Sequence, residues 1–261
     1  MFAIASRIEE SSLLSSPEQS VPFTKKDYAL QLSGSAHSAA VVVPLLLSQL
    51  SVHSIVDFGS GNGAWLDAFL AAGVSDVQGV EGGDVNESEL CIPSSRMIRC
   101  NLEQSVDLGR QFDLAMSVEV AEHLPERSAE GFVKTVSSHS DLVLFSAAVP
   151  GQGGHHHINE QWPSYWAEKF GQQGMSCYDI LRPMIWESSE VSWWYRQNLL
   201  LFARGEREAE LSRWGASAAP LKLVHPEMFG KLLSERRGVR ASASDLSAAI
   251  WRRASRALAQ R

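Results

Sequence analysis

The stretch Val56-Asp57-Phe58-Gly59-Ser60-Gly61-Asn62-Gly63 joins a short apolar run to an amphipathic one. Residues 54–58 have the pattern of a buried strand, and residues 64–72 place four large apolar side chains on one helical face. A glycine turn between a strand and a helix brings backbone N–H groups and a helix N-terminus close to a ligand. The stretch therefore predicts a ligand-binding loop at the carboxyl end of the first strand.

Outward from this loop, strands alternate with helices along the chain. Further strands are expected at residues 76–80, 96–99, 112–118 and 141–147, with helical stretches such as residues 126–138 between them. This alternation predicts an α/β fold with a doubly wound, mostly parallel, seven-stranded sheet. Residues 163–173 are expected to be helical, and residues 175–181 and 199–203 are expected to form an antiparallel edge hairpin.

The segments outside the sheet complete the expected organisation. A helix over residues 27–50, broken or kinked near Pro44, predicts a helical N-terminal lid. We expect a flexible N-terminal segment (1–22), a catalytic domain (23–203) and a basic helical C-terminal extension (204–261) with amphipathic helices at about 226–237 and 245–259. Those two helices are suited to forming a homodimer.

Composition excludes several classes of protein. The 261 residues carry 23 Lys and Arg against 30 Asp and Glu, a net charge of −7, and 44% are hydrophobic, as in a folded globular chain. Residues 204–261 hold 12 of the basic and 6 of the acidic residues, so the remainder is strongly acidic and a nucleic-acid partner is not expected.

No segment predicts a membrane or secretory protein. The longest apolar run, residues 39–47, contains Pro44 and is far shorter than a membrane span, and residues 1–22 lack a basic leader region. Cys91, Cys100 and Cys177 are odd in number and far apart, which favours reduced structural thiols. We expect a cytoplasmic protein.

Two ligands remain compatible with the glycine loop taken alone. Gly59, Gly61 and Ala64 fit a dinucleotide fingerprint, whereas Asp57, Gly59, Gly61 and Gly63 fit D-x-G-x-G-x-G, which suits a nucleoside that carries an amino acid. Glu81 ends the second strand, where a carboxylate can accept hydrogen bonds from ribose hydroxyls, and both interpretations require this.

The fourth strand separates the two interpretations. It continues as FDLAMSVEVAEHLP over residues 112–125, and the order VDFGSGNG, VEGG, FDLAMSVEVAEHLP resembles the class I S-adenosylmethionine-dependent methyltransferases over about residues 28–203. The resemblance implies S-adenosylmethionine as the cofactor. It also implies cofactor contacts from Asp57, Gly59, Gly61, Gly63, Glu81, Asn101, Leu102 and Glu119. Asn101 departs from the acidic residue that is common at the adenine edge.

Candidates for the chemistry follow the fourth and fifth strands. Glu119, Glu122 and His123 are spaced i, i+3 and i+4, so they share one face of a helix start. Some relatives hold a divalent cation with such residues, and His155, His156 or His157 could complete a site. Most relatives with similar residues hold none, so we expect no metal, with Glu119 and His123 as catalytic candidates and packing or helix capping as the alternative for His123.

The loop after the fifth strand carries three glycines and three histidines before NEQWPSYW. His157 and Asn159 are the first choices for a general base and its orienting group, and a loop held by its own side-chain hydrogen bonds is the alternative. Trp162 and Trp166 are expected to pack in the core. Arg182 and Arg196 could bind a substrate carboxylate or phosphate or form surface pairs, and the basic residues Arg236, Arg237, Arg252 and Arg253 are expected to form a solvated or interface face.

The function indicated is a methyltransferase acting on a small molecule such as a secondary metabolite, an amino acid or a sugar derivative. One alternative is an enzyme that cyclises S-adenosylmethionine itself to azetidine-2-carboxylate with release of methylthioadenosine. Another is a non-enzymatic scaffold that binds the cofactor.

Overall fold

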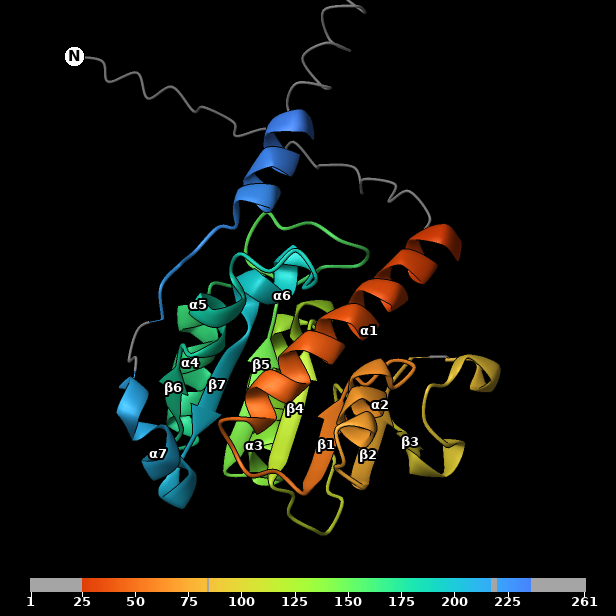
Figure 1. Cartoon of the computed structure of the whole chain (residues 1–261), viewed down its shortest axis with the longest axis vertical. Helices are drawn as coiled ribbons and strands as arrows, with labels where there is room; N and C mark the ends of the chain where they lie inside the picture. The colour runs from red at the N-terminus through yellow and green to blue at the C-terminus, as the bar shows by residue number, and fades with distance from the viewer. Residues whose placement is uncertain (1–24, 84, 217–219, 236–261) are drawn as a thin grey trace, which may run out of the picture.

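Seven strands form a single sheet in the computed structural model, which describes residues 25–83, 85–216 and 220–235, with side chains from residue 34 onward (Figure 1). The strand order is β3-β2-β1-β4-β5-β7-β6. The bounds are β1 Ser54–Phe58, β2 Asp76–Glu81, β3 Met97–Arg99, β4 Leu114–Val118, β5 Leu142–Ser146, β6 Ser176–Tyr178 and β7 Leu200–Ala203. The pairs among β1 to β5 are parallel, and β7 runs antiparallel to both β5 and β6, which confirms the predicted fold class.

Helices cover both faces of the sheet (Figure 1). The α-helices are α1 Lys25–Leu47, α2 Ala64–Ala71, α3 Ala129–Ser138, α4 Pro163–Gln172, α5 Leu181–Ile185, α6 Trp193–Asn198 and α7 Gly205–Leu211. Short 3-10 turns are η1 Glu87–Glu89, η2 Ser94–Arg96, η3 Ala121–His123, η4 Glu126–Ser128 and η5 Ser212–Trp214. Residues 226–235 form a further helix. The apolar faces of α1, α2, α5 and α6 share one core cluster, and those of α3 and α4 share the other.

Three helical expectations need adjustment. Pro44 lies inside α1, which continues to Leu47, so the helix is not broken there. The helix expected from residue 126 begins as the 3-10 turn η4 and becomes α-helical at Ala129. In α1, Ala39, Val42 and Leu46 are buried in the main core, so this part of the helix is a layer of the fold.

The C-terminal part of the described chain packs on the domain. Leu211 of α7 is buried in the core, and Glu208 accepts hydrogen bonds from Ser176 Oγ (2.6 Å) and Tyr178 Oη (3.2 Å) of β6. The boundary at residue 203 stays a prediction. The 1–22 segment, the 245–259 helix, and Arg236, Arg237, Arg252 and Arg253 lie outside the described residues.

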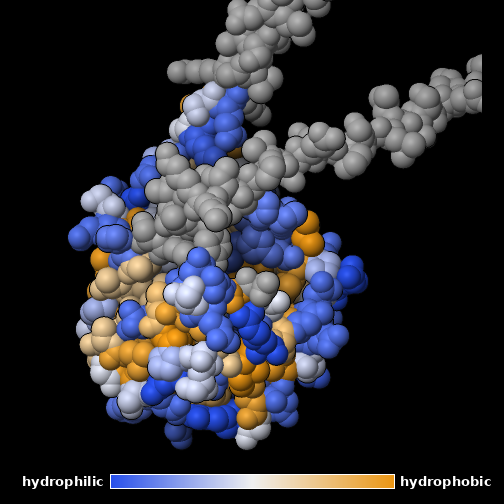
Figure 2. Space-filling view, turned by 90° about the vertical axis from the view of Figure 1, so that its right-hand side faces the viewer, coloured by the Kyte–Doolittle hydropathy of each residue, from blue (hydrophilic) through white to orange (hydrophobic). Residues whose placement is uncertain are grey.

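Two further expectations concern the surface and the thiols. No helix among the described residues has the length and apolarity that a membrane crossing requires. All three cysteines are free. On the side of the molecule that carries the β3 edge, hydrophobic residues form separate patches among hydrophilic ones (Figure 2).

The parallel strands bring the predicted loops to one edge of the sheet. Gly59 N donates to Val80 O (2.8 Å), which ties the loop after β1 to the end of β2. Glu119 N donates to Ser146 O (3.0 Å), which ties the end of β4 to the end of β5. In open α/β sheets the crevice outside these carboxyl ends is where ligands bind.

Candidate functional site

The glycine loop after β1 uses three residues with positive φ. Gly59, Gly61 and Gly63 have φ of 88°, 56° and 85°, values that favour glycine. A Cβ at Gly59 would lie 2.4 Å from Val120 Cγ2, so this glycine lets the loop pack on the segment after β4. A Cβ at Gly61 would meet no described atom within 4 Å other than its chain neighbours, so Gly61 faces open space where a ligand can approach.

Two carboxylates flank this loop. Glu81 at the end of β2 accepts hydrogen bonds from Gly61 N and Gly83 N, both at 2.6 Å. Asp57 on β1 is buried, and its Oδ1 has no hydrogen-bond partner among the described residues. Burial, followed by the nearby charge of Glu81, raises the pKa of Asp57 well above its usual value. A donor from a bound ligand would satisfy Asp57 and relieve this cost.

The residues predicted for the adenine edge lie after β3. Leu102 is buried in the core beside the sheet, and Asn101 is exposed with its Oδ1 accepting from Glu103 N (2.9 Å). The side-chain oxygen of Asn101 thus already caps a turn. A pocket of about 190 Å³ lies beside Glu81, lined also by Val85, Leu90 and Met97 among others.

Glu119 is held by two amides from distant parts of the chain. Its Oε2 accepts from Gln152 Nε2 (2.8 Å) and its Oε1 from Asn198 Nδ2 (3.0 Å). The backbone at Glu119 has φ 55°, an uncommon conformation for a residue with a side chain. Burial raises the pKa of the Glu119 carboxyl, and these hydrogen bonds offset the effect in part.

Glu122 and two histidines form a compact cluster. The possible metal-ligating atoms of Glu122, His123 and His157 all lie within 4.8 Å of one another. Glu122 is fully buried, and neither carboxylate oxygen has a hydrogen-bond partner among the described residues. Burial, followed by the charge of Glu119, raises its pKa well above the usual value. Burial and the neighbouring His157 lower the pKa of His123 to about 4, so its imidazole is neutral at pH 7.

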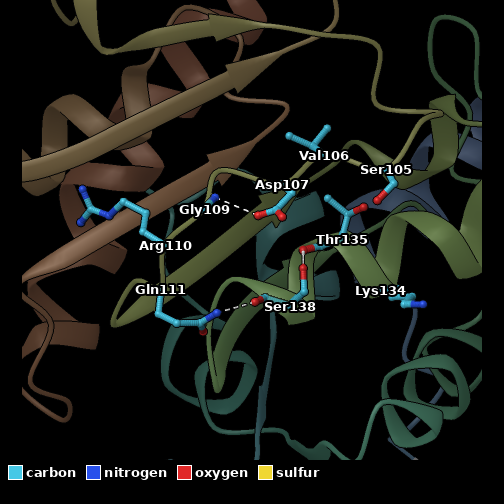
Figure 3. A pocket seen from close by; sticks show the side chains of 9 residues that line it. All are labelled: Ser105, Val106, Asp107, Gly109, Arg110, Gln111, Lys134, Thr135 and Ser138. Carbon is cyan, nitrogen blue, oxygen red and sulfur yellow. Dashed lines mark hydrogen bonds between the residues drawn. The ribbon is translucent and has the colours of Figure 1, made fainter.

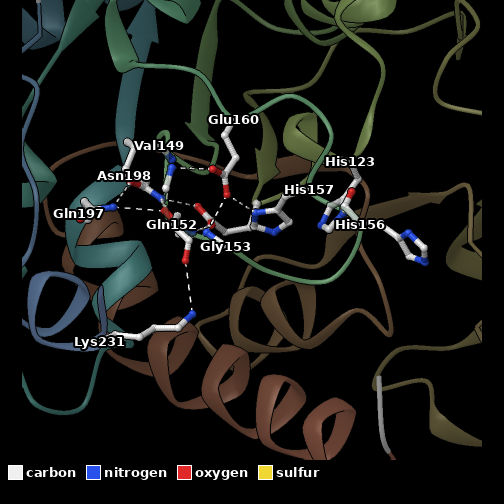
Figure 4. A network of polar contacts seen from close by, with 12 residues as sticks. His123, Val149, Gln152, Gly153, His156, His157, Glu160, Gln197, Asn198 and Lys231 are labelled. Carbon is white, nitrogen blue, oxygen red and sulfur yellow. Dashed lines mark hydrogen bonds and ion pairs between the residues drawn. The ribbon is translucent and has the colours of Figure 1, made fainter. Parts of the chain in front are cut away.

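Glu160 accepts hydrogen bonds that hold the loop after β5, which carries the three consecutive histidines, in place (Figure 4). Its carboxylate accepts from Gly151 N (2.7 Å), from Gly153 N (2.8 Å) and from His157 Nδ1 (3.0 Å). Burial acts to raise the pKa of Glu160, but these hydrogen bonds outweigh it and lower the pKa overall. Asn159 is buried, its Oδ1 accepts from Gln161 Nε2 (3.0 Å), and its Nδ2 has no described partner.

The fold is similar to that of several solved structures. Similar solved structures include DesVI from Streptomyces venezuelae (14% identity, TM-score 0.51, covering 68% of this chain and 95% of that one). Another is CalS10, an amino pentose methyltransferase from Micromonospora echinaspora (15% identity, TM-score 0.50, covering 71% and 98%). A third is magnesium protoporphyrin IX methyltransferase from Synechocystis PCC 6803 with bound SAH (17% identity, TM-score 0.50, covering 68% and 88%).

The fold is that of a Rossmann-like methyltransferase. No protein-family model matches the sequence, and no curated protein does.

On this methyltransferase fold, the residues that the Glu-x-x-Glu-His spacing grouped together lie close to one another but have different partners. The expected helix start is the 3-10 turn η3, and Glu119 lies before it with a positive φ. Glu119 therefore turns toward Gln152 and Asn198, whereas Glu122 and His123 approach His157.

The two arginines considered for substrate binding instead form ion pairs and hydrogen bonds within the protein. Arg182 is buried, forms an ion pair with Asp179 and donates to the carbonyl of Gln197 (3.2 Å). Arg196 forms an ion pair with Glu227 and donates to Trp186 O (3.1 Å). Trp166 is buried against Phe145, which confirms its packing role.

A separate polar pocket of about 440 Å³ lies away from the strand ends that carry the glycine loop (Figure 3). It is lined by residues that precede β4 and by the end of α3, including Asp107, Arg110 and Thr135. None of the predicted site residues lines it, so it does not belong to the candidate site.

Proposed function

We propose that this protein is an S-adenosylmethionine-dependent methyltransferase that acts on a small molecule. The observation that carries the proposal is the buried Asp57 carboxyl, whose Oδ1 has no hydrogen-bond partner among the described residues, beside a glycine loop whose Gly61 faces open space. Such a carboxyl needs a donor, and the amino acid end of S-adenosylmethionine offers one. The similar solved structures with methyltransferase activity in their names support the same conclusion.

In this proposal the chain's own residues hold the cofactor along the carboxyl edge of the sheet. Asp57 and the loop of Gly59, Gly61 and Gly63 would contact the methionine end and the ribose. Glu81 would accept hydrogen bonds from the ribose diol, while its bonds to Gly61 N and Gly83 N orient the carboxylate. Leu102 and Asn101 would flank the adenine. When bound, the cofactor supplies a methyl group on a sulfonium.

The acceptor side of the proposal is formed by Glu119, His123, His157 and Asn159. These residues come from the ends of β4 and β5, next to the predicted methionine end of the cofactor. The loop and the segment after β4 are joined by Ile158 N and Asn159 N, which donate to Glu122 O (2.9 and 3.0 Å). This fixed geometry can align an acceptor and keep water away, which is most of what a protein contributes to an in-line displacement.

The decisive test removes the predicted ribose contact. We expect Glu81→Ala to lower the affinity for S-adenosylhomocysteine at least tenfold, because each charge-assisted hydrogen bond contributes about 1.5 to 3 kcal/mol. Titration calorimetry measures this, and the exposed Glu89→Ala of η1 is the matched control. An unchanged affinity in Glu81→Ala, or a wild-type protein that binds NADH instead, would contradict the assignment.

A second measurement separates methyl transfer from the alternatives. In the cyclisation alternative, S-adenosylmethionine incubated with the protein alone yields methylthioadenosine, which mass spectrometry detects. A methyltransferase yields S-adenosylhomocysteine, and only when an acceptor is present. A scaffold yields neither. We expect no methylthioadenosine.

A cytoplasmic location and a role in small-molecule biosynthesis stay predictions.

A further inference from the structure

The buried carboxylate of Glu122 is the feature of this site that the cofactor does not explain. Its side chain is fully buried, and both oxygens lack hydrogen-bond partners among the described residues. The backbone N–H groups of Glu122 itself and of Ala148 act to lower its pKa, but they do not outweigh the effect of burial. A buried carboxylate without a donor costs several kcal/mol unless it is paired or binds a metal. The raised pKa of Glu122 reflects this cost, which either a bound proton or a bound cation relieves.

The two imidazoles beside Glu122 are both oriented by their Nδ1 atoms. His157 Nδ1 contacts Glu160 Oε1 (3.0 Å), and His123 Nδ1 contacts His156 O (3.3 Å). A carboxylate and a carbonyl only accept, so each Nδ1 carries a proton and each Nε2 is the nitrogen left to bind a cation. A histidine whose other nitrogen donates to a carboxylate or a carbonyl has the arrangement of metal-bound imidazoles.

We propose that Glu122, His123 and His157 bind a divalent transition-metal cation. Ligands at about 2.1 Å from an ion lie about 3 to 4 Å apart, and the three candidate ligand atoms lie within 4.8 Å of one another, so small side-chain rotations close the site. Glu119 is outside the ligand set because Asn198 and Gln152 occupy its two oxygens. This inference reverses the expectation of no metal drawn from the sequence.

The donor set selects among cations. Two imidazole nitrogens and one carboxylate suit Mn²⁺, Fe²⁺, Co²⁺ or Zn²⁺, whereas Mg²⁺ and Ca²⁺ prefer oxygen ligands only. Three protein ligands also leave coordination positions open for another molecule. The cluster thus has the composition of a site that binds a ligand, in contrast to a closed structural site.

The proposal names the acceptor class and in that respect rests on the proposed function. The cluster follows β4 and β5, beside Glu119 at the predicted methionine end. A hydroxyl oxygen bound at an open position would have a lower pKa and lose its proton to solvent. The oxygen lone pair then forms the O–CH₃ bond, the S–CH₃ bond breaks, and its electron pair stays on sulfur in S-adenosylhomocysteine. An alcohol or phenol is therefore the expected acceptor.

The experiment measures metal binding by the tag-free, full-length protein after chelator treatment. We expect calorimetry to find one Co²⁺ per chain and an affinity at least tenfold lower in His157→Ala and in Glu122→Gln. Glu122→Gln keeps the side-chain shape and removes the buried charge, so it tests the site without opening the loop. His155→Ala is the matched control from the same loop and is expected to bind Co²⁺ as the wild type does.

Each outcome decides one part of the inference. The site would be overturned if the wild type did not bind Co²⁺, or if both Glu122→Gln and His157→Ala bound it with wild-type affinity. Water-proton relaxation by bound Mn²⁺ is expected to show exchangeable water, and its absence would overturn the acceptor role. Binding of S-adenosylhomocysteine is measured separately: if it binds and Co²⁺ does not, only this inference fails, and in the reverse case the proposed function fails.

Discussion

Gln152 is the residue through which three distant segments meet at the site. Its Nε2 donates to Glu119, and its Oε1 accepts from Asn198 Nδ2 (2.9 Å) and Gln197 Nε2 (3.2 Å). Its backbone carbonyl accepts from Lys231 Nζ (3.4 Å) of the 226–235 helix. Because Gln152 is buried, truncating it would leave several buried polar groups without partners.

We expect Gln152→Ala to lower the free energy of unfolding by about 2 to 4 kcal/mol, since each unsatisfied buried group costs about 1 to 3 kcal/mol. Urea unfolding measures this. Gln172→Ala at the exposed end of α4 is the control and should change stability by about 0.5 kcal/mol or less. Equal effects of the two substitutions would show that the network around Glu119 does not stabilise the fold.

This network marks the limit of what the sequence predicts about the site. Asp57, the glycines and Glu81 follow from a local motif, and the structure places them together at one edge. Gln152 and Asn198 lie 33 and 79 residues from Glu119, and no spacing rule links amides over such separations. Glu160, three residues after His157, was the one available signal, because an H-x-x-E spacing allows the carboxylate to orient the imidazole.

In the loop from β1 to α2, Gly59 and Gly61 need to be glycine for different physical reasons. Gly59→Ala combines a positive φ with a Cβ 2.4 Å from Val120, whereas Gly61→Ala meets only the positive φ. We expect Gly59→Ala to lose about 3 kcal/mol or more of unfolding free energy, and Gly61→Ala about 1 to 2 kcal/mol. Urea unfolding compares them.

Two further measurements test the physical reason given for each of these glycines. Adding Val120→Ala to Gly59→Ala removes the two closest methyl groups and should recover part of the stability. Gly61→Ala should weaken S-adenosylhomocysteine binding, because its Cβ projects into the open space of the loop. If Gly61→Ala bound the ligand as tightly as the wild type, the ligand would not lie against this glycine.

Strands β1 to β5 were predictable from the sequence for a physical reason. Buried parallel strands are short apolar runs with sharp polar boundaries, and the observed strands β1 to β5 begin and end within two residues of the predicted positions. Helix ends depend on local capping, so Glu126–Ser128 formed a 3-10 turn and Pro44 remained inside α1. β6 is shorter than expected because its chain enters α5 at Leu181.

The whole molecule is built with α1 as a layer, which the sequence interpretation as a lid did not anticipate. Figure 1 shows α1 crossing the sheet, and its second half shares a core cluster with α2, β1 and α6. An amphipathic pattern shows that a helix has a buried face without showing which surface covers that face. The burial of Ala39, Val43 and Leu46 now identifies that surface as the main core.

If α1 is a layer of the fold, truncating its core face must destabilise the whole molecule. Leu46 is 1% exposed, so we expect Leu46→Ala to lower the free energy of unfolding by about 2 to 5 kcal/mol through lost burial and the cavity left behind. Leu221→Ala is the matched control, because Leu221 is 65% exposed and should change stability by about 0.5 kcal/mol or less. The two unfolding free energies can be compared if urea unfolds both variants in a single transition. A small effect of Leu46→Ala, equal to that of Leu221→Ala, would mean that α1 separates from the sheet in solution and that the helix is a movable lid after all.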